Sequence, residues 1–173
     1  MPVKKKTARR APAKSKTAAP AGPQSAADRK AAESQLTAMI SRHAPEHHKL
    51  LTTARKSLGK HLPSAYEIIY EYRSWVVISY SPSDRGYQGV LGLRADADSV
   101  KLYFTQGKTL PDPEKLLQGS ANARWIQLES ASTLTRPAVL RLVNEALARN
   151  PIPFAPADGG LGPVIINSTS AKK

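Results

Sequence analysis

A Gly-Lys-Thr triplet at residues 107–109 closely follows a segment, Val100–Phe104, that is predicted to be a β-strand. In phosphate-binding loops this triplet ends the pattern G-x-x-x-x-G-K-[ST], whose backbone N–H groups surround the phosphates before a long helix begins. Here the residue five positions before Gly107 is Leu102, and Pro111 lacks a backbone donor and prevents an uninterrupted helix. The sequence therefore predicts a connecting loop and no nucleotide site.

Carboxylates, the hard oxygen ligands suited to iron delivery, are scattered along the chain. Among the 13 Asp and Glu residues, two pairs come closest to forming clusters. Asp96 and Asp98 fall in a predicted turn, where short acidic side chains are common. Glu67 and Glu71 share one face of a predicted strand, and we expect that face to be the solvated one. Neither pair indicates a metal site.

Histidine, cysteine and serine do not indicate a catalytic or metal-binding set either. The chain has no Cys, which excludes disulfides, thiolate nucleophiles and Cys-based metal sites. His43 and His47 are four residues apart, but Pro45 between them predicts that they belong to different helices. The serines near residue 81 lack the context of a nucleophile elbow. We therefore predict a protein that is not an enzyme, with no catalytic residues, metal or cofactor.

The aromatic residues are more informative, because they gather where strands are predicted. Both Trp and all six Tyr lie between Tyr66 and Trp125. Those that point away from the helices, with Arg73, Arg85 or Arg124 nearby, would form a shallow ligand site on the sheet. The alternative is ordinary packing of aromatic side chains in the sheet.

Positive charge is concentrated at the N-terminus. The net charge is +13, and residues 1–30 hold six Lys and three Arg against one acidic residue, Asp28. Residues 1–24 contain no Leu, Ile or aromatic residue, so we expect a disordered basic tail. Such a tail either binds nucleic acid without sequence preference or only keeps the protein in solution. The tail residues predicted to contact nucleic acid are Lys4, Lys5, Lys6, Arg9, Arg10, Lys14 and Lys16.

No segment is predicted to enter a membrane. The N-terminus lacks the apolar stretch of a secretory signal, and its Lys, Ala and Pro composition is typical of a bacterial disordered tail. The longest strongly apolar run, Trp75–Ile78, is far shorter than the roughly 20 residues that a membrane span requires. We expect a cytoplasmic protein.

These residues must be positioned by helices and strands, and the first elements predicted are two helices. Ser25 can cap a helix together with Asp28, and a second helix is predicted over about Pro45–Leu58, with Gly59 as its stop. The first helix has apolar residues at helical spacing, namely Ala32, Leu36, Met39 and Ile40.

A meander of three or four antiparallel strands is predicted next, from Tyr66 to Phe104. Asp112 is expected to cap a helix of one to two turns that ends at Gly119. A further strand over residues 123–129 and a helix over about Thr135–Asn150 complete the pattern. The predicted fold class is α+β, with an antiparallel sheet of about four to five strands packed on helices and with disordered termini. The predicted divisions are residues 1–24, a domain over 25–150 and a loosely attached Pro/Gly-rich tail over 151–173.

One part of this pattern is specific enough to suggest a family. Gly107 follows a strand, "LPDP" at 110–113 and "LQG" at 117–119 come next, and Arg124 opens the following strand. Together with the aromatic-rich stretch "YEYRSWVVISYSPSDRG", this pattern resembles the YdhG-like family of small bacterial domains of unknown function, over about Pro45–Asn150. The resemblance implies an α+β fold with an antiparallel sheet backed by helices. The candidate ligand-binding residues in these stretches are Tyr70, Tyr72, Arg85, Gly107, Asp112 and Arg124.

Three functions are compatible with these observations. The first is a non-enzymatic binding or adaptor domain with a basic tail that binds nucleic acid non-specifically. The second is an intracellular iron chaperone, because some relatives in the family are labelled as frataxin-type chaperones. The third is a small-molecule-binding protein or enzyme that uses the aromatic region of the sheet.

Overall fold

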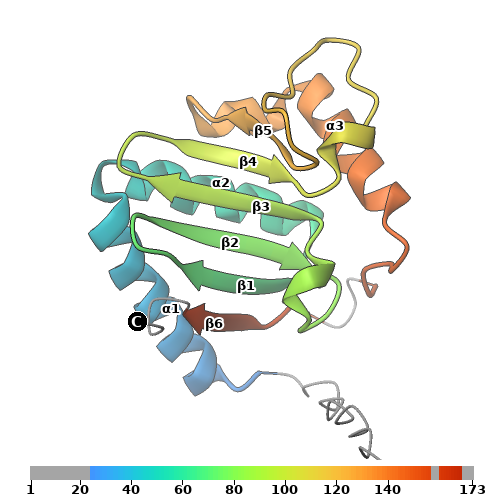
Figure 1. Ribbon diagram of the computed structural model, residues 1–173. Coiled ribbons are helices and arrows are strands. Elements are labelled where there is room, and N and C mark those ends of the chain that lie inside the picture. The colour runs from blue at the N-terminus through green and yellow to red at the C-terminus, as the bar shows by residue number, and fades with distance from the viewer. Residues whose placement is uncertain (1–23, 157–159, 169–173) are drawn as a thin grey trace, which may run out of the picture.

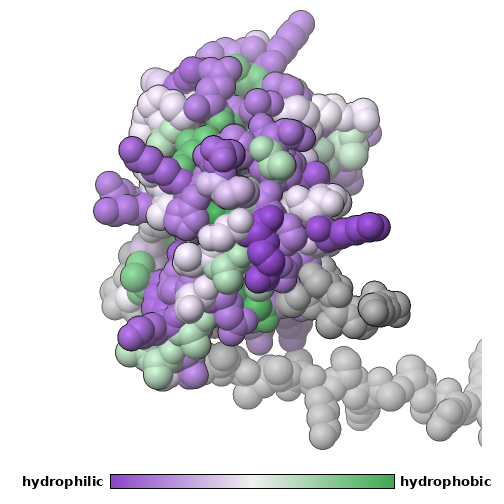
Figure 2. Space-filling model, turned by 90° about the vertical axis from the view of Figure 1, so that its left-hand side faces the viewer, coloured by the Kyte–Doolittle hydropathy of each residue, from purple (hydrophilic) through white to green (hydrophobic). Residues whose placement is uncertain are grey.

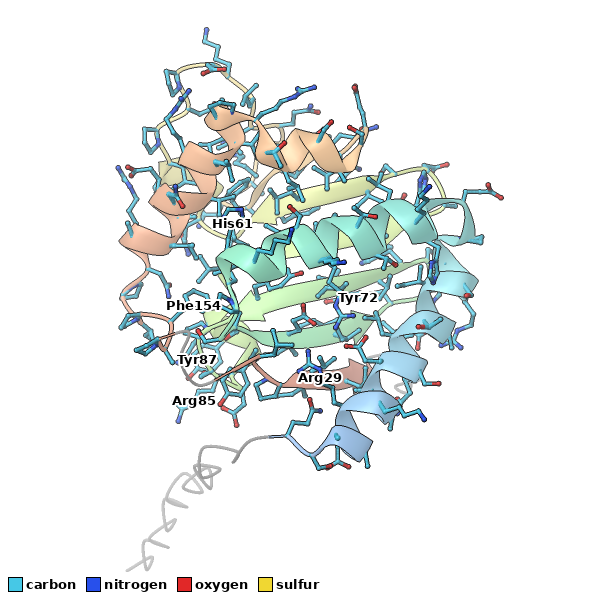
Figure 3. The ribbon with its side chains drawn as sticks, turned by 180° about the vertical axis from the view of Figure 1, so that it is seen from behind. Arg29, His61, Tyr72, Arg85, Tyr87 and Phe154 are labelled. Atoms are coloured by element: carbon cyan, nitrogen blue, oxygen red, sulfur yellow. The ribbon has the colours of Figure 1, made fainter. Side chains whose placement is uncertain are left out.

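A six-stranded sheet with α-helices against one of its faces forms the framework of the protein. The computed structural model describes residues 24–156 and 160–168. Figure 1 shows the sheet from its helix-free side, and Figure 3 shows the helices in front of the sheet. This confirms the predicted α+β class. The predicted tail contacts at residues 4–16 lie outside the described residues.

The helices begin and end largely where the sequence predicts. They are α1 (Ala26–His43), α2 (His48–His61) and α3 (Pro137–Arg149). The backbone N–H of Asp28 donates to the Ser25 hydroxyl, so the predicted cap is confirmed. The predicted stop at Gly59 is wrong, because α2 continues to His61. Pro63 explains the actual end, since a residue that precedes proline is disfavoured in helical conformation.

The sheet has the order β5-β4-β3-β2-β1-β6. Its strands are β1 (Tyr66–Glu71), β2 (Trp75–Ser81), β3 (Leu91–Asp96), β4 (Val100–Phe104), β5 (Arg124–Gln127) and β6 (Val164–Ser168). The first five form an antiparallel meander, as predicted. β6 is parallel to β1, so the sheet is mixed and has one strand more than expected.

β6 lies in the segment that we expected to be a loosely attached tail. Val164 is buried in the core, and the strand pairs with β1 from Glu67 to Glu71. The side-chain amide of Gln24 donates to the Val164 carbonyl (2.7 Å) and accepts from its N–H (2.9 Å). Residues from both ends of the described chain thus complete this edge of the sheet.

The segment after β4 differs most from the prediction. No helix forms over residues 112–119, and Lys115 takes a positive φ of 55°, which right-handed helices exclude. The predicted helix cap at Asp112 is therefore wrong, and its carboxylate instead closes a loop by accepting from the N–H groups of Leu116 (2.9 Å) and Leu117 (2.7 Å). Gln118 then pairs through its backbone with Trp125, which requires extended backbone and explains the missing helix.

The two glutamates of β1 face the helices, so the predicted solvated face is wrong. Glu67 and Glu71 are 9% and 8% exposed. They pair across the strands with Tyr80 and Val76, which are completely buried in the core on the helix side. The reason is ionic pairing, because arginines from the helices neutralise both carboxylates and let them be buried.

Each carboxylate has its own partners. Arg55 of α2 donates to Glu67 (2.9 Å from Nε) and to Glu33 of α1 (2.6 and 2.7 Å). Burial alone would lower the pKa of Arg55, but the hydrogen bonds to Glu33 and Glu67 outweigh burial and raise it. Arg42 and His43, at the end of α1, bind the Glu71 carboxylate at 2.6 and 2.9 Å. These contacts fasten α1 and α2 to the sheet.

The end of the molecule that carries the β1–β2 and β3–β4 turns is mostly hydrophilic (Figure 2). Asp96 shapes the second turn by accepting from the N–H groups of Asp98 (3.0 Å) and Ser99 (2.9 Å), so the predicted turn role of Asp96 is confirmed. Within the described ranges, no helix is both long and apolar enough to cross a membrane.

Candidate ligand-binding face

The face of the sheet that carries no helix is lined by two rows of side chains that run from β1 to β5. Residues paired across neighbouring strands point to the same side, so the register defines both rows. The first row consists of Tyr70, Val77, Arg94, Lys101 and Gln127. The second row consists of Ile68, Ser79, Gly92, Tyr103 and Trp125. We call this surface the open face.

One aromatic cluster lies at the β1–β2 turn. The rings of Tyr72 and Trp75 stack with centroids 5.2 Å apart, and Tyr70 is 6.5 Å from Tyr72. The Arg94 guanidinium lies 4.2 Å from the centroid of the Trp75 ring. Such a cation over an aromatic face is attracted by the ring quadrupole.

A second cluster lies on β4 and β5. The Tyr103 and Trp125 centroids are 6.5 Å apart, and the Lys101 ammonium lies 4.5 Å from the Trp125 ring. Gly119 packs against the same indole with a φ of 103°, a conformation that favours glycine. Both clusters therefore combine neighbouring rings, stacked in the first and tilted in the second, with a cation from the adjacent strand.

Between the two clusters the open face is hollowed into a trough of about 360 Å³. Tyr72 and Trp75 line it near the β1–β2 turn, and Tyr103 lines it on β4. On the central strands it is lined by the small side chain of Ser79 and by Gly92, which has none. A Cβ at Gly92 would be 3.4 Å from its nearest neighbour, an ordinary contact. The backbone therefore does not require glycine here, and its effect is to keep the trough open.

The trough is lined by one cation, Arg94, and by hydroxyl groups that include those of Ser79 and Thr105. Arg94 is 3.6 Å from the Asp96 carboxylate, and its buried Nε has no hydrogen-bond partner among the described residues. Burial raises the pKa of the Tyr70 hydroxyl, which outweighs the opposite effect of a hydrogen bond to Asn167. The phenol is therefore neutral at physiological pH, and the charge beside the aromatic rings is positive.

A loop at residues 82–89 packs against Tyr70 at one end of the open face. Gly86 approaches the Tyr70 hydroxyl so closely that a Cβ would overlap it, which explains the glycine. Ile68 is only 1% exposed although it lies on the helix-free side. Arg85, in the same loop, donates to the Tyr87 hydroxyl at 3.1 Å, and both lie at the end of the molecule where Phe154 is found (Figure 3).

The six candidate residues do not form one site. Tyr72 lines the trough, Tyr70 is its neighbour beneath the loop, and Arg85 lies outside it. Gly107 packs against Arg124 so tightly that a Cβ would lie 2.9 Å from the Arg124 backbone nitrogen.

The remaining two candidates have structural contacts. Arg124 donates to the Gly119 carbonyl, and Asp112 caps its loop. The motif that resembles the YdhG-like family therefore builds the connection from β4 to β5.

Sequence reasoning identified the aromatic region but not the cations beside it. Arg94 and Lys101 were missed, because nothing local in the sequence says which rings they cover. The available signal was the cross-strand register, since both residues belong to one row. Gly92 was missed because a glycine in a strand usually suggests a bulge or a close approach.

Groupings of metal ligands are absent from the part of the chain that the structure describes, where no three His, Asp or Glu residues come together. Glu67 and Glu71 are bound by arginines, and the Asp96 carboxylate accepts a hydrogen bond within the β3–β4 turn.

In comparisons with known proteins, no family model, no curated protein and no solved structure matches this chain. The YdhG-like resemblance therefore stays a prediction.

Proposed function

We propose that this protein is a non-enzymatic binding domain that holds single-stranded nucleic acid on its open face. The observation that carries the proposal is the trough between two aromatic clusters, each with a cation over its indole. Unpaired bases expose flat faces that stack on aromatic side chains, and they do so with little dependence on base identity. An exposed sheet with aromatic residues on central strands is a recurring platform for such stacking.

The dimensions suit more than one base. Neighbouring strands are about 4.8 Å apart, so Trp75 on β2 and Tyr103 on β4 are about 10 Å apart across the sheet. Trp75 pairs with Asp96 and Tyr103 with Gly92, so the two residues are also offset by four residues, about 13 Å, along the strands. The trough between them is therefore long enough for more than one stacked planar group. A duplex hides its base faces, so the open face favours an unpaired strand.

Charge supports the same ligand. Arg94 and Lys101 lie over the indole rings, so a base that stacks on those faces displaces them, and the displaced cations are then near enough to contact the phosphates of the strand. The 23 residues before Gln24 add seven Lys and Arg residues, all between Lys4 and Lys16. These basic residues supply phosphate contacts that depend on salt and not on sequence.

The iron-chaperone and enzyme alternatives receive less support. Iron delivery needs accessible carboxylates, but Glu67 and Glu71 are buried and bound to arginines. The open face offers rings and cations, which recognise anionic aromatic compounds and polyanions. A small aromatic anion would use the same trough without needing the basic tail.

The test is fluorescence anisotropy with labelled 12-nucleotide DNA and RNA strands against the full chain, over a range of salt concentrations. Gly92→Val fills the trough with a residue that suits a strand, and Gly59→Ala is a glycine replacement in α2 with open space around it. We expect Gly92→Val to weaken binding about tenfold or more, since stacking contributes about 1–3 kcal/mol per base. Gly59→Ala should leave the affinity unchanged.

A second variant separates the tail from the face. Replacing the seven basic tail residues by Gln should reduce the slope of log affinity against log salt by about 0.7 for each phosphate that the tail no longer neutralises. Gly92→Val should weaken binding and change that slope less than the tail variant does, because only Arg94 and Lys101 contact phosphates at the open face. Equal affinities for wild type and Gly92→Val, with thermal melts showing both folded, would refute the role of the open face.

A further inference from the structure

A second cavity, of about 370 Å³, lies at the end of the sheet where β3 begins and β4 ends. It is bordered by the loop that carries Tyr87 and by the C-terminal end of α3. Thr105 lines both this cavity and the trough of the open face, so the two hollows adjoin. A strand lying along the trough would therefore reach the cavity by passing Thr105.

The cavity has an apolar floor and a rim rich in amides. Its apolar lining includes Val90, Leu110 and Ala146, and amides are contributed by Gln88, Gln106 and Asn150. Its volume is within the range of about 300–1,000 Å³ that is usual for small-ligand sites. Such a lining suits a flat group with both apolar faces and hydrogen-bonding edges.

Several rim groups have hydrogen-bonding capacity to spare. The Gln106 side chain makes no hydrogen bond to any described residue. The side-chain carbonyl oxygen of Gln88 accepts from the Ser83 hydroxyl (2.5 Å), so the NH₂ group of Gln88 is available to donate to a ligand. The Thr105 hydroxyl donates to the Gly89 carbonyl (2.8 Å) and can still accept. The rim therefore offers both donors and acceptors.

The charge of the cavity is balanced. Arg149 lines it, but its guanidinium is bound by Glu145 at 2.9 Å and by the Thr109 carbonyl at 3.3 Å. A phosphate would have to compete with the Glu145 carboxylate for that cation. The cavity thus favours a neutral group, whereas Arg94 beside the trough has a buried Nε without a partner among the described residues.

We propose that this cavity receives and reads one nucleobase of the strand bound on the open face. The inference rests on the proposed function, because the strand delivers the base past Thr105. Gln88 and Gln106 bond the edge of the base, and Tyr87, which is 78% exposed at the cavity mouth, offers its ring for stacking. The open face then supplies most of the affinity and the cavity supplies base preference.

The experiment measures the affinity of the full chain for 12-mers of uridine, cytidine and adenosine at fixed salt. We expect the best and the worst strand to differ about tenfold, as expected when one or two hydrogen bonds at a buried edge cannot form. Gln106→Ala removes one amide from the rim of the cavity. Ile152→Trp places a larger side chain in the cavity lining, at a position that can accept it because Ile152 is 39% exposed. Gln35→Ala, on the exposed side of α1, is the matched control.

Both cavity variants should reduce the preference to about twofold while the affinity for the weakest strand stays the same, and Gln35→Ala should change neither. Wild-type protein that binds all three strands equally, with sensitivity to Gly92→Val, would overturn the cavity inference and leave the proposed function intact. A preference that persists in both cavity variants would also overturn it. No binding to any strand would overturn both proposals.

Discussion

Replacing Arg55 by alanine tests whether the buried ion network holds the helices on the sheet. The side chain makes hydrogen bonds to Glu67 and to both carboxylate oxygens of Glu33. Without it, the 9% exposed Glu67 would be a buried charge beside the fully buried Tyr80. Breaking a buried pair in this way costs about 3–5 kcal/mol. For a domain of this size, that corresponds to a fall in Tm of roughly 10–15 °C.

The assay is urea unfolding at pH 7, followed by circular dichroism, with Arg149→Ala as the control. Arg149 also forms an ion pair, with Glu145, but both side chains are about half exposed, at 52% and 45%. Exposed pairs contribute little, so the control should be destabilised by less than about 0.5 kcal/mol. A destabilisation by Arg55→Ala as small as that of the control would refute the argument from desolvation.

The pH dependence of Arg55→Ala gives an independent check. In the wild type, the hydrogen bonds from Arg55 lower the pKa of Glu33 below its ordinary value of 4.5. The stability that this pair contributes is therefore present above about pH 4.5 and is lost as the pH falls through the lowered pKa, whereas the variant lacks it at every pH. The difference in stability between wild type and variant should thus narrow as the pH falls below about 4.5.

Further predictions concern the native ion pairs, two glycines and the edge of the sheet. In the wild type, hydrogen bonds from Arg42 and His43 outweigh burial and lower the pKa of Glu71. The stabilisation that Glu71 contributes is therefore present above about pH 4.5 and is lost as the pH falls through the lowered pKa. A fall in Tm over that pH range would show this loss. Gly107→Ala should cost about 1–3 kcal/mol in urea unfolding, because the new Cβ would overlap its neighbour. Gly59→Ala should instead stabilise the same protein by about 0.5–1 kcal/mol, since it lies within α2 with nothing near it. Gln24→Ala should speed hydrogen exchange at β6, because it removes two hydrogen bonds at the sheet edge.

Local patterns predicted the elements whose signals are contained within a few residues. The Ser25 cap, the alternation in β1 to β4 and the apolar stripe of α3 each depend on neighbours in the sequence. The helix expected after Asp112 does not form, and its carboxylate bonds two N–H groups of a loop instead. Its loop was not predictable, because the backbone of Gln118 is held by Trp125.

The addition of β6 and the burial of Glu67 and Glu71 were decided by contacts over long sequence separations. β6 pairs with a strand almost 100 residues earlier, and the glutamates are neutralised by arginines of α1 and α2. Neither contact leaves a local signature, and an acidic residue on a strand is otherwise expected to face water.

The sequence by itself determined the composition of the candidate site: aromatic residues concentrated in the strands, an excess of positive charge and no cysteine chemistry. Only the tertiary structure decided which rings and cations share a surface, because a side chain's face depends on strand register and on which face the helices cover. The trough forms where Gly92 and Ser79 meet across two strands between Trp75 and Tyr103. A surface of this kind is a property of pairing between strands, and pairing is set by the free energy of the whole fold.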